Sequence, residues 1–141
     1  MTAIQQPRPA SVWPVRVYYE DTDAAGVVYY ANYLKFCERA RTEWLRTLGI
    51  DQKNLIDTRQ LAFVVARVEA DYLRGAELDD ALEVISSISA LGAASILFHQ
   101  EIRRTGSLLF TATVKIACVD GFKRRAVRIP DDLRHLFESK A

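Results

Sequence analysis

Two aspartates lie close together in the stretch "EDTDAAGVVYYANYLKF", residues 20–36. Asp21 and Asp23 flank Thr22, and Gly26 follows before the stretch becomes apolar and aromatic. An ionised aspartate can attack a carbonyl carbon as a nucleophile, or it can act as a general base that activates water. The same triplet is also typical of a turn with capping side chains, and spacing alone favours that interpretation. Gly26 is expected to allow a left-handed backbone or the close approach of a substrate.

The segment after the triplet is predicted to be a helix that could supply hydrogen-bond donors. Apolar residues recur at helical spacing from about residue 30 to residue 48, whereas charged residues such as Glu38 and Arg41 are expected to lie mostly away from that stripe. A helix starting near Tyr30 presents free N–H groups and a positive dipole end, which suit a developing oxyanion. Asp23 lies seven positions before Tyr30, so the loop can bring carboxylate and donors together. Gly49 is well placed to end the helix.

Other residue types that could do chemistry form no pattern. The two histidines, His99 and His135, are far apart, and Cys37 and Cys118 lie in apolar periodic segments where small core residues are expected. These spacings do not indicate a metal site. The sequence contains neither the G-x-S-x-G elbow of serine hydrolases nor a glycine-rich phosphate loop. No metal or redox cofactor is therefore expected.

Composition and charge indicate one ordinary globular domain. The chain has 141 residues, half of them apolar, and a net charge of +1. This balance gives no bulk field that would favour nucleic acid or a membrane surface, and no apolar run is long enough for a membrane span. We expect a flexible tail over residues 1–13, a single domain over residues 14–141 and a cytoplasmic location.

Period-two alternation predicts strands around the helix. The expected strands cover residues 14–20, 64–73, 82–91, 95–104 and 107–119, with a helical turn in 51–57 and a closing helix in 129–139. Short turns between the later strands favour antiparallel pairing. A lone helix with a rich apolar stripe must be covered, so the sequence predicts an α+β fold in which a curved antiparallel sheet wraps around one long helix.

The segment "YYEDTDAAGVVYYANYLKFCERARTEWLRTLGI" closely resembles the start of hotdog-fold thioesterases of the 4-hydroxybenzoyl-CoA thioesterase class. The nearest branch is the bacterial acyl-CoA thioesterases linked to the Tol-Pal envelope system. The shared motif is D-x-D-x-x-G-x-V-Y followed by N-Y, here Asp21, Asp23, Gly26, Val28, Tyr29, Asn32 and Tyr33. The resemblance extends to "VRIPDDL" near the end of the chain. The Tol-Pal branch usually carries histidine after the motif tyrosine, whereas this chain has Tyr30, as the hydroxybenzoyl enzymes do.

The resemblance implies hydrolysis of an acyl-CoA to a free acid and coenzyme A, with the coenzyme as part of the substrate. It makes Asp23 the nucleophile or general base and leaves Asp21 and Thr22 to shape the loop. The backbone N–H of Tyr30 is then the expected oxyanion donor, and Gly26 and Tyr29 are expected near the substrate. It also implies a homo-oligomer, either a dimer in which two sheets join edge to edge or a dimer of dimers that forms a tetramer.

Several alternatives stay open at this level. Lys123, Arg124 and Arg125 are candidates for the phosphates of coenzyme A, but ordinary surface charge is an equally good interpretation. The same cations would suit acyl-carrier protein, an acidic partner, as the carrier of the acyl group. A non-catalytic acyl-binding or envelope-associated scaffold of the same fold is a further alternative. Acyl length, and the choice between aromatic and aliphatic acyl groups, do not follow from the residues.

Overall fold

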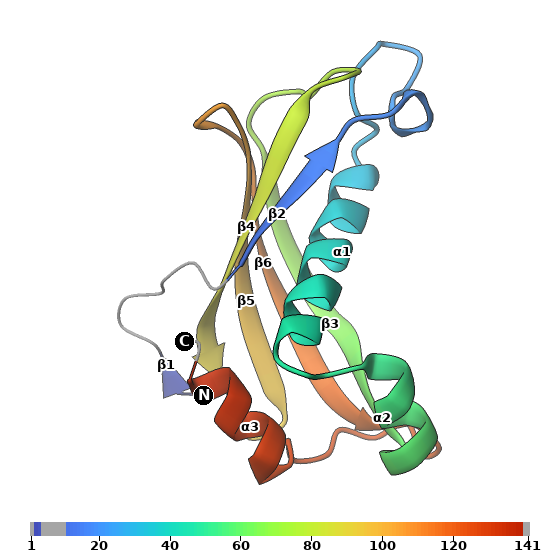
Figure 1. Ribbon diagram of the computed structural model, residues 1–141, viewed down its shortest axis with the longest axis vertical. Coiled ribbons are helices and arrows are strands. Elements are labelled where there is room, and N and C mark those ends of the chain that lie inside the picture. The colour runs from blue at the N-terminus through green and yellow to red at the C-terminus, as the bar shows by residue number, and fades with distance from the viewer. Residues whose placement is uncertain (1, 4–10, 140–141) are drawn as a thin grey trace.

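One curved antiparallel sheet wraps around a long helix in the computed structural model, which describes residues 2–3 and 11–139 (Figure 1). This arrangement confirms the predicted α+β fold. The helices are α1 (Asn32–Thr47), α2 (Gln52–Arg59) and α3 (Asp131–Glu138), with a 3₁₀ turn η1 at Tyr19–Asp21. The strands are β1 (Thr2–Ala3), β2 (Ser11–Arg16), β3 (Leu61–Tyr72), β4 (Ala81–Leu91), β5 (Ser95–Arg104) and β6 (Ser107–Asp120).

The strand order leaves β3 at one edge of the sheet. The strands β4, β5, β6 and β3 lie side by side in that order, and β1 and β2 both pair with the outer edge of β4. All of these pairs are antiparallel, as the short connections predicted. Among the described residues, β3 pairs only with β6, so the other edge of this 12-residue strand has no partner.

The core lies between α1 and the concave face of the sheet. The predicted stripe of α1 is buried, with Phe36, Cys37 and Trp44 at most 2% exposed. Trp44 packs edge-on against Phe98 of β5, and their ring centroids lie 5.5 Å apart. Alternate residues of β6 from Phe110 to Cys118 complete the floor, as the period of two predicted. Gly49 has a φ of +83° just after α1, which confirms its expected role.

Three sequence-based expectations need correction. The first strand runs from Ser11 to Arg16 rather than over residues 14–20, because Tyr19–Asp21 turn into a 3₁₀ helix. The predicted tail, residues 1–13, therefore includes part of β2 and the two-residue strand β1; residues 1 and 4–10 lie outside the described part of the chain. Finally, Arg41 is only 8% exposed, because Gln100 of β5 accepts a hydrogen bond from its guanidinium inside the core.

Candidate active site

The aspartate motif folds as a small hairpin in front of α1. An antiparallel bridge joins Thr22 to Val28, and the N–H of Asp23 donates to the carbonyl of Val27 at 2.9 Å. Gly26 closes the turn with a φ of +84°, a conformation that favours glycine, so its expected left-handed backbone is confirmed. A second bridge, from Val27 to Glu77, holds the hairpin against the segment before β4.

Asp21 shapes this hairpin from within. Its carboxylate accepts a hydrogen bond from the N–H of Tyr18 at 2.8 Å, and its carbonyl accepts from the N–H of Tyr29 and from the side-chain amide of Asn32. Asn32 is the first residue of α1, so these bonds tie the loop to the start of the helix. The geometry agrees with the structural role expected for Asp21.

Asp23 lies exposed at the tip of the hairpin. Its Oδ1 accepts a hydrogen bond from the N–H of Ala25 at 2.8 Å, and its Oδ2 accepts none from the described residues. The first contact is the turn-capping geometry that the spacing suggested, and it orients the side chain. The carboxylate therefore keeps one oxygen for a substrate or a water molecule. Asp23 lies opposite Val27, and Val27 is three residues before Tyr30. The backbones of Val27 and Tyr30 are therefore at most about 11 Å apart.

Tyr30 lies two residues before α1 rather than at its first position. Ala31 is the N-cap, with helical angles and no capping hydrogen bond from its side chain. Within residues 2–3 and 11–139, the backbone N–H of Tyr30 donates to no acceptor. This free N–H and the positive end of a 16-residue helix are the donors that a developing oxyanion would need. The Tyr30 side chain is 61% exposed, and the ring of Tyr29 lies beside it.

Two tyrosines hold this segment in place, Tyr33 of the shared motif and Tyr72, which the sequence analysis did not single out. The hydroxyl of Tyr72, near the end of β3, donates to the carbonyl of Tyr30 at 2.9 Å. The buried hydroxyl of Tyr33 accepts a hydrogen bond from the N–H of Ala76, and its ring stacks on Phe110. Partial burial and the neighbouring tyrosines raise the pKa of Tyr72, so its hydroxyl stays a donor at neutral pH. Residue type alone did not reveal this role, because aromatic residues at helical or alternating spacing are also typical of core positions.

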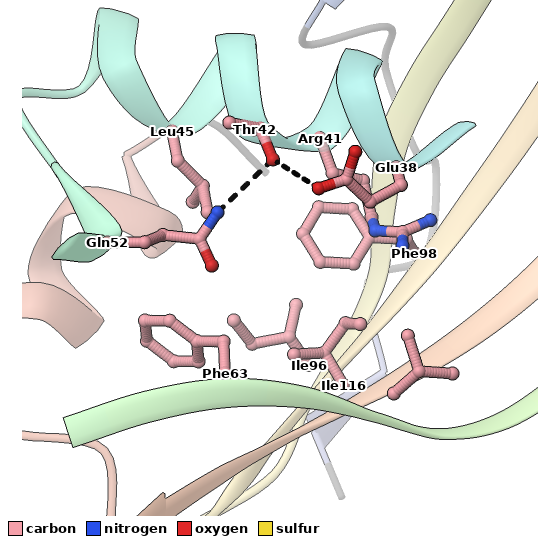
Figure 2. Close-up of a pocket in the computed structure, with 10 residues that line it drawn as sticks. Glu38, Arg41, Thr42, Leu45, Gln52, Phe63, Ile96, Phe98 and Ile116 are labelled. Carbon is pink, nitrogen blue, oxygen red and sulfur yellow. Dashed lines mark hydrogen bonds between the residues drawn. The ribbon is translucent and has the colours of Figure 1, made fainter. Parts of the chain in front are cut away.

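A groove lies between α1 and β3. We call this space, of about 370 Å³, the α1–β3 groove; its walls include Leu34, Lys35, Glu38, Val65 and Val68. Glu38, Arg41 and Val65 also line a second, inner cavity of about 90 Å³ beneath the helix (Figure 2). The floor of that cavity is apolar and comes from the sheet, with Phe63, Ile96, Phe98 and Ile116. The opposite wall carries polar groups of α1 and α2.

The basic residues proposed for coenzyme A lie at the other end of the sheet. Lys123, Arg124 and Arg125 form an exposed turn after β6, in which the N–H of Lys123 donates to Asp120. The hairpin instead contacts the segment just before β4, near the first residues of β6. Because β6 has 14 residues, these ends are about 40 Å apart along the strand. A single chain therefore does not bring the basic turn together with Asp23.

The remaining candidates are placed where they do not approach the hairpin. Burial raises the pKa of the Cys37 thiol to about 12, so it is protonated at neutral pH and is a poor nucleophile. Cys118 is buried as well, and His135 is exposed on α3. Within the described residues, no cluster of three or more His, Cys, Asp or Glu side chains could hold a metal ion. No helix in the described part of the chain is long and apolar enough to cross a membrane.

Comparison with known proteins gives consistent relatives. The chain matches the model of the thioesterase-like superfamily over residues 17–137. It is 52% identical to an acyl-CoA thioesterase YbgC of Haemophilus influenzae over 89% of this chain and 92% of the relative. It is 45% identical to an acyl-CoA thioester hydrolase YbgC of Escherichia coli over 86% of this chain and 90% of the relative.

Solved structures agree with these relatives. A probable thioesterase from Bartonella henselae superposes with a TM-score of 0.81 at 38% identity, covering 84% of this chain and 98% of that one. A 1,4-dihydroxy-2-naphthoyl-CoA thioesterase from Synechocystis gives a TM-score of 0.84 at 26% identity, covering 90% and 94%. The predicted resemblance is therefore confirmed: the chain belongs to the thioesterase-like superfamily, as a hotdog-fold protein similar to the Tol-Pal-associated acyl-CoA thioesterases.

Proposed function

We propose that the protein hydrolyses acyl-CoA thioesters, with Asp23 as the nucleophile or general base and the N–H of Tyr30 as an oxyanion donor. The observation that carries this proposal is the hairpin before α1. Among the described residues, one oxygen of its Asp23 carboxylate and the N–H of Tyr30, two residues before the helix, have no hydrogen-bond partner. The similarity to an acyl-CoA thioesterase and an acyl-CoA thioester hydrolase supports the choice of substrate.

The reaction uses these groups in a simple order. The thioester carbonyl lies between Asp23 and the start of α1. Either the carboxylate attacks the carbonyl carbon to give an anhydride, or it removes a proton from a water molecule that attacks instead. In both cases negative charge develops on the carbonyl oxygen, where the Tyr30 N–H and the helix dipole stabilise it. In the general-base route, coenzyme A leaves as a thiolate that takes back the proton Asp23 removed from water, and the acyl group is released as the free acid. In the anhydride route, coenzyme A leaves as a thiolate and takes a proton from water. A water molecule then hydrolyses the anhydride, which releases the free acid and restores the Asp23 carboxylate.

A dimer would bring the separated parts of the site together. Val64, Val65 and Val68 of the unpaired β3 edge are 43%, 51% and 38% exposed, and a long apolar edge of this kind is a hazard unless it is covered. A second copy pairing antiparallel across a two-fold axis would cover it. Because β3 then runs in opposite directions in the two copies, the Leu61 end of one copy lies at the Tyr72 end of the other.

This arrangement assigns the basic turn to the neighbouring site. The turn lies beside the start of β3, since the N–H of Gly121 donates to the carbonyl of Gln60 at 2.7 Å. In the antiparallel dimer, Lys123–Arg125 of one copy therefore approach the hairpin of the other, where they can bind the phosphates of coenzyme A. Acyl-carrier protein, which is acidic, would meet the same cations.

The test is a hydrolysis panel of short, long and aromatic acyl-CoAs, with matching acyl-carrier-protein thioesters. Turnover of at least one acyl-CoA supports the proposal. Turnover of carrier-protein thioesters alone would move the function to that carrier. An absence of turnover on every thioester would support an acyl-binding scaffold.

A further inference from the structure

Arg41 is a buried cation without an acidic partner. It is 8% exposed, and no carboxylate of the described residues lies within 4.0 Å of its guanidinium. Its single hydrogen bond within those residues goes from Nη1 to the side-chain oxygen of Gln100, at 2.8 Å. A guanidinium carries five N–H donors, and burying such a charge without a partner is costly. Burial accordingly lowers the pKa of Arg41.

The unused donors of Arg41 face the α1–β3 groove. No fully buried side-chain nitrogen of the described residues lacks a hydrogen-bond partner, so the remaining guanidinium nitrogens must be open to a cavity. Arg41 lines both the groove and the inner cavity, and these are the spaces that it can reach. Apart from the polar groups of α1 and α2, their surroundings are aliphatic and aromatic side chains, including Val65 and Phe98.

Glu38 shares the groove and its charge acts to raise the pKa of Arg41, but within the described residues the two side chains form no ion pair. Its Oε1 accepts a hydrogen bond from the hydroxyl of Thr42 at 3.1 Å, and Thr42 in turn accepts one from Gln52 at 3.2 Å (Figure 2). Glu38 itself is exposed. Lys35 also lines the groove, so its ionisable walls are two cations and one carboxylate, a net charge of +1. A carboxylate bound in the groove would therefore meet walls of net positive charge.

The nearest wall of the groove lies about one helical turn beyond Tyr30. Leu34 forms part of its wall on α1 and lies four residues after Tyr30. Val68 forms part of its wall on β3 and lies four residues before Tyr72. The rise of a helix separates Tyr30 from Arg41 by about 16 Å. Because helical side chains lean toward the N-terminus, the guanidinium lies nearer to Tyr30 than that. An acyl chain of medium length, held by its thioester at Tyr30, would end beside Arg41.

We propose that the α1–β3 groove binds the acyl group of the substrate and that Arg41 binds a carboxylate at its far end, which makes ω-carboxyacyl-CoA thioesters the preferred substrates. This inference rests on the proposed function. The apolar walls accept the methylene chain, and the guanidinium forms the charge-assisted hydrogen bonds that it lacks within the protein. A plain alkyl chain of the same length would leave Arg41 unpaired in the closed complex.

The experiment compares matched pairs of thioesters, pentanoyl-CoA with glutaryl-CoA and octanoyl-CoA with suberyl-CoA. For the longer pair, we expect the kcat/KM of the dicarboxylic thioester to be higher by about 10- to 100-fold, the worth of a hydrogen bond to a charged group. Arg41→Met should abolish that preference. Glu38→Gln should increase the preference for the dicarboxylic thioester, because it removes a negative charge that repels the substrate carboxylate. Since Glu38 is exposed, this variant keeps the test informative if Arg41→Met does not fold.

Three outcomes would overturn the inference. Equal turnover of octanoyl-CoA and suberyl-CoA by the wild-type protein would do so while leaving acyl-CoA hydrolysis intact. If the protein hydrolysed none of these thioesters and no other acyl-CoA, the proposed function would be wrong as well. Free propionate could stabilise the folded wild-type protein but not Arg41→Met, while the wild-type protein shows no preference among the thioesters. Arg41 would then bind a free carboxylate rather than the end of an acyl group.

Discussion

Asp23 and Asp21 have the same side chain and opposite surroundings. The carboxylate of Asp21 faces back into its own turn, where it accepts from Tyr18, whereas Asp23 lies exposed at the hairpin tip with one oxygen free. The resemblance separated the two residues before any geometry was known, and spacing alone did not. The two residues differ in the hydrogen bonds that their carboxylates accept, and residue type alone does not reveal those bonds.

Asp23→Asn is expected to lower kcat/KM by about 10²–10⁴-fold, the usual contribution of a general base. The amide keeps an oxygen that can accept from Ala25, so the hairpin should persist. Asp21→Asn is the matched control, since it makes the same change beside the proposed reaction centre and should leave most activity. Steady-state hydrolysis and circular dichroism are the measurements. If Asp23→Asn kept most of its activity, Asp23 would be a turn-capping residue and not the nucleophile or general base.

Tyr72 offers a second test at this scale, because its hydroxyl orients the backbone of Tyr30 from outside the motif. Tyr72→Phe keeps the ring contacts and removes one hydrogen bond, so we expect kcat to fall by about tenfold, the equivalent of 1.4 kcal/mol. KM and melting temperature should change little. Tyr30→Phe keeps the N–H and should retain activity. A Tyr72→Phe enzyme with unchanged kcat would show that the Tyr30 peptide needs no support.

At the scale of elements, the helix and the sheet are joined by a buried polar cluster as well as by apolar contacts. Gln100 of β5 accepts from Arg41 and donates to the carbonyl of Cys37 and to the hydroxyl of Ser86. Gln100 is 0% exposed, so each of these partners depends on it. The cluster fixes how α1 lies on the sheet, and thereby where the start of α1 points.

Gln100→Leu should therefore lower the free energy of unfolding by about 3 kcal/mol, because it leaves a buried cation and a carbonyl without partners. Ser86→Ala removes only one contact of the same cluster and should cost about 1 kcal/mol. Urea denaturation of both variants measures the difference. If the two costs were equal, the cluster would not act through Gln100.

Sequence periodicity predicted the helices and strands well, but it did not predict the buried polar contacts between them. The helical stripe and the alternation in β5 and β6 follow from repeated burial, which leaves a regular pattern in residue type. Arg41 was expected among the exposed charges, because an arginine inside the core is recognisable only together with Gln100, 59 positions away. The separation of Asp23 from Lys123–Arg125 could not be predicted either, because it depends on the direction in which β6 runs.

At the scale of the whole molecule, the unpaired β3 edge predicts a dimer. Val65 lies near the middle of the strand, where a two-fold axis would bring two copies of it close together. Val65→Lys should therefore shift the protein toward monomers in sedimentation experiments at micromolar concentration, because an edge lysine opposes strand pairing. Ile56→Lys, on the equally exposed α2, is the control and should not change the assembly. A wild-type protein that sediments as an active monomer would contradict the prediction.

The antiparallel dimer also predicts which chain contributes each half of the active site. A variant with Lys123 and Arg125 replaced by alanine should show a raised KM for acyl-CoA, and Asp23→Asn should show almost no turnover. In a mixed dimer of these two variants, the intact Asp23 of one copy faces the intact basic turn of the other. One complete site per dimer is thereby restored.

We therefore expect mixed dimers, isolated with two different affinity tags, to hydrolyse acyl-CoA with the wild-type KM and about half of the wild-type kcat, because one of two equivalent sites is intact. If the basic turn served the hairpin of its own chain, the only active site in the mixed dimer would carry the alanines. The raised KM of the double-alanine variant would then persist after mixing. The KM of the mixed dimer therefore distinguishes a site shared between chains from one that a single chain completes.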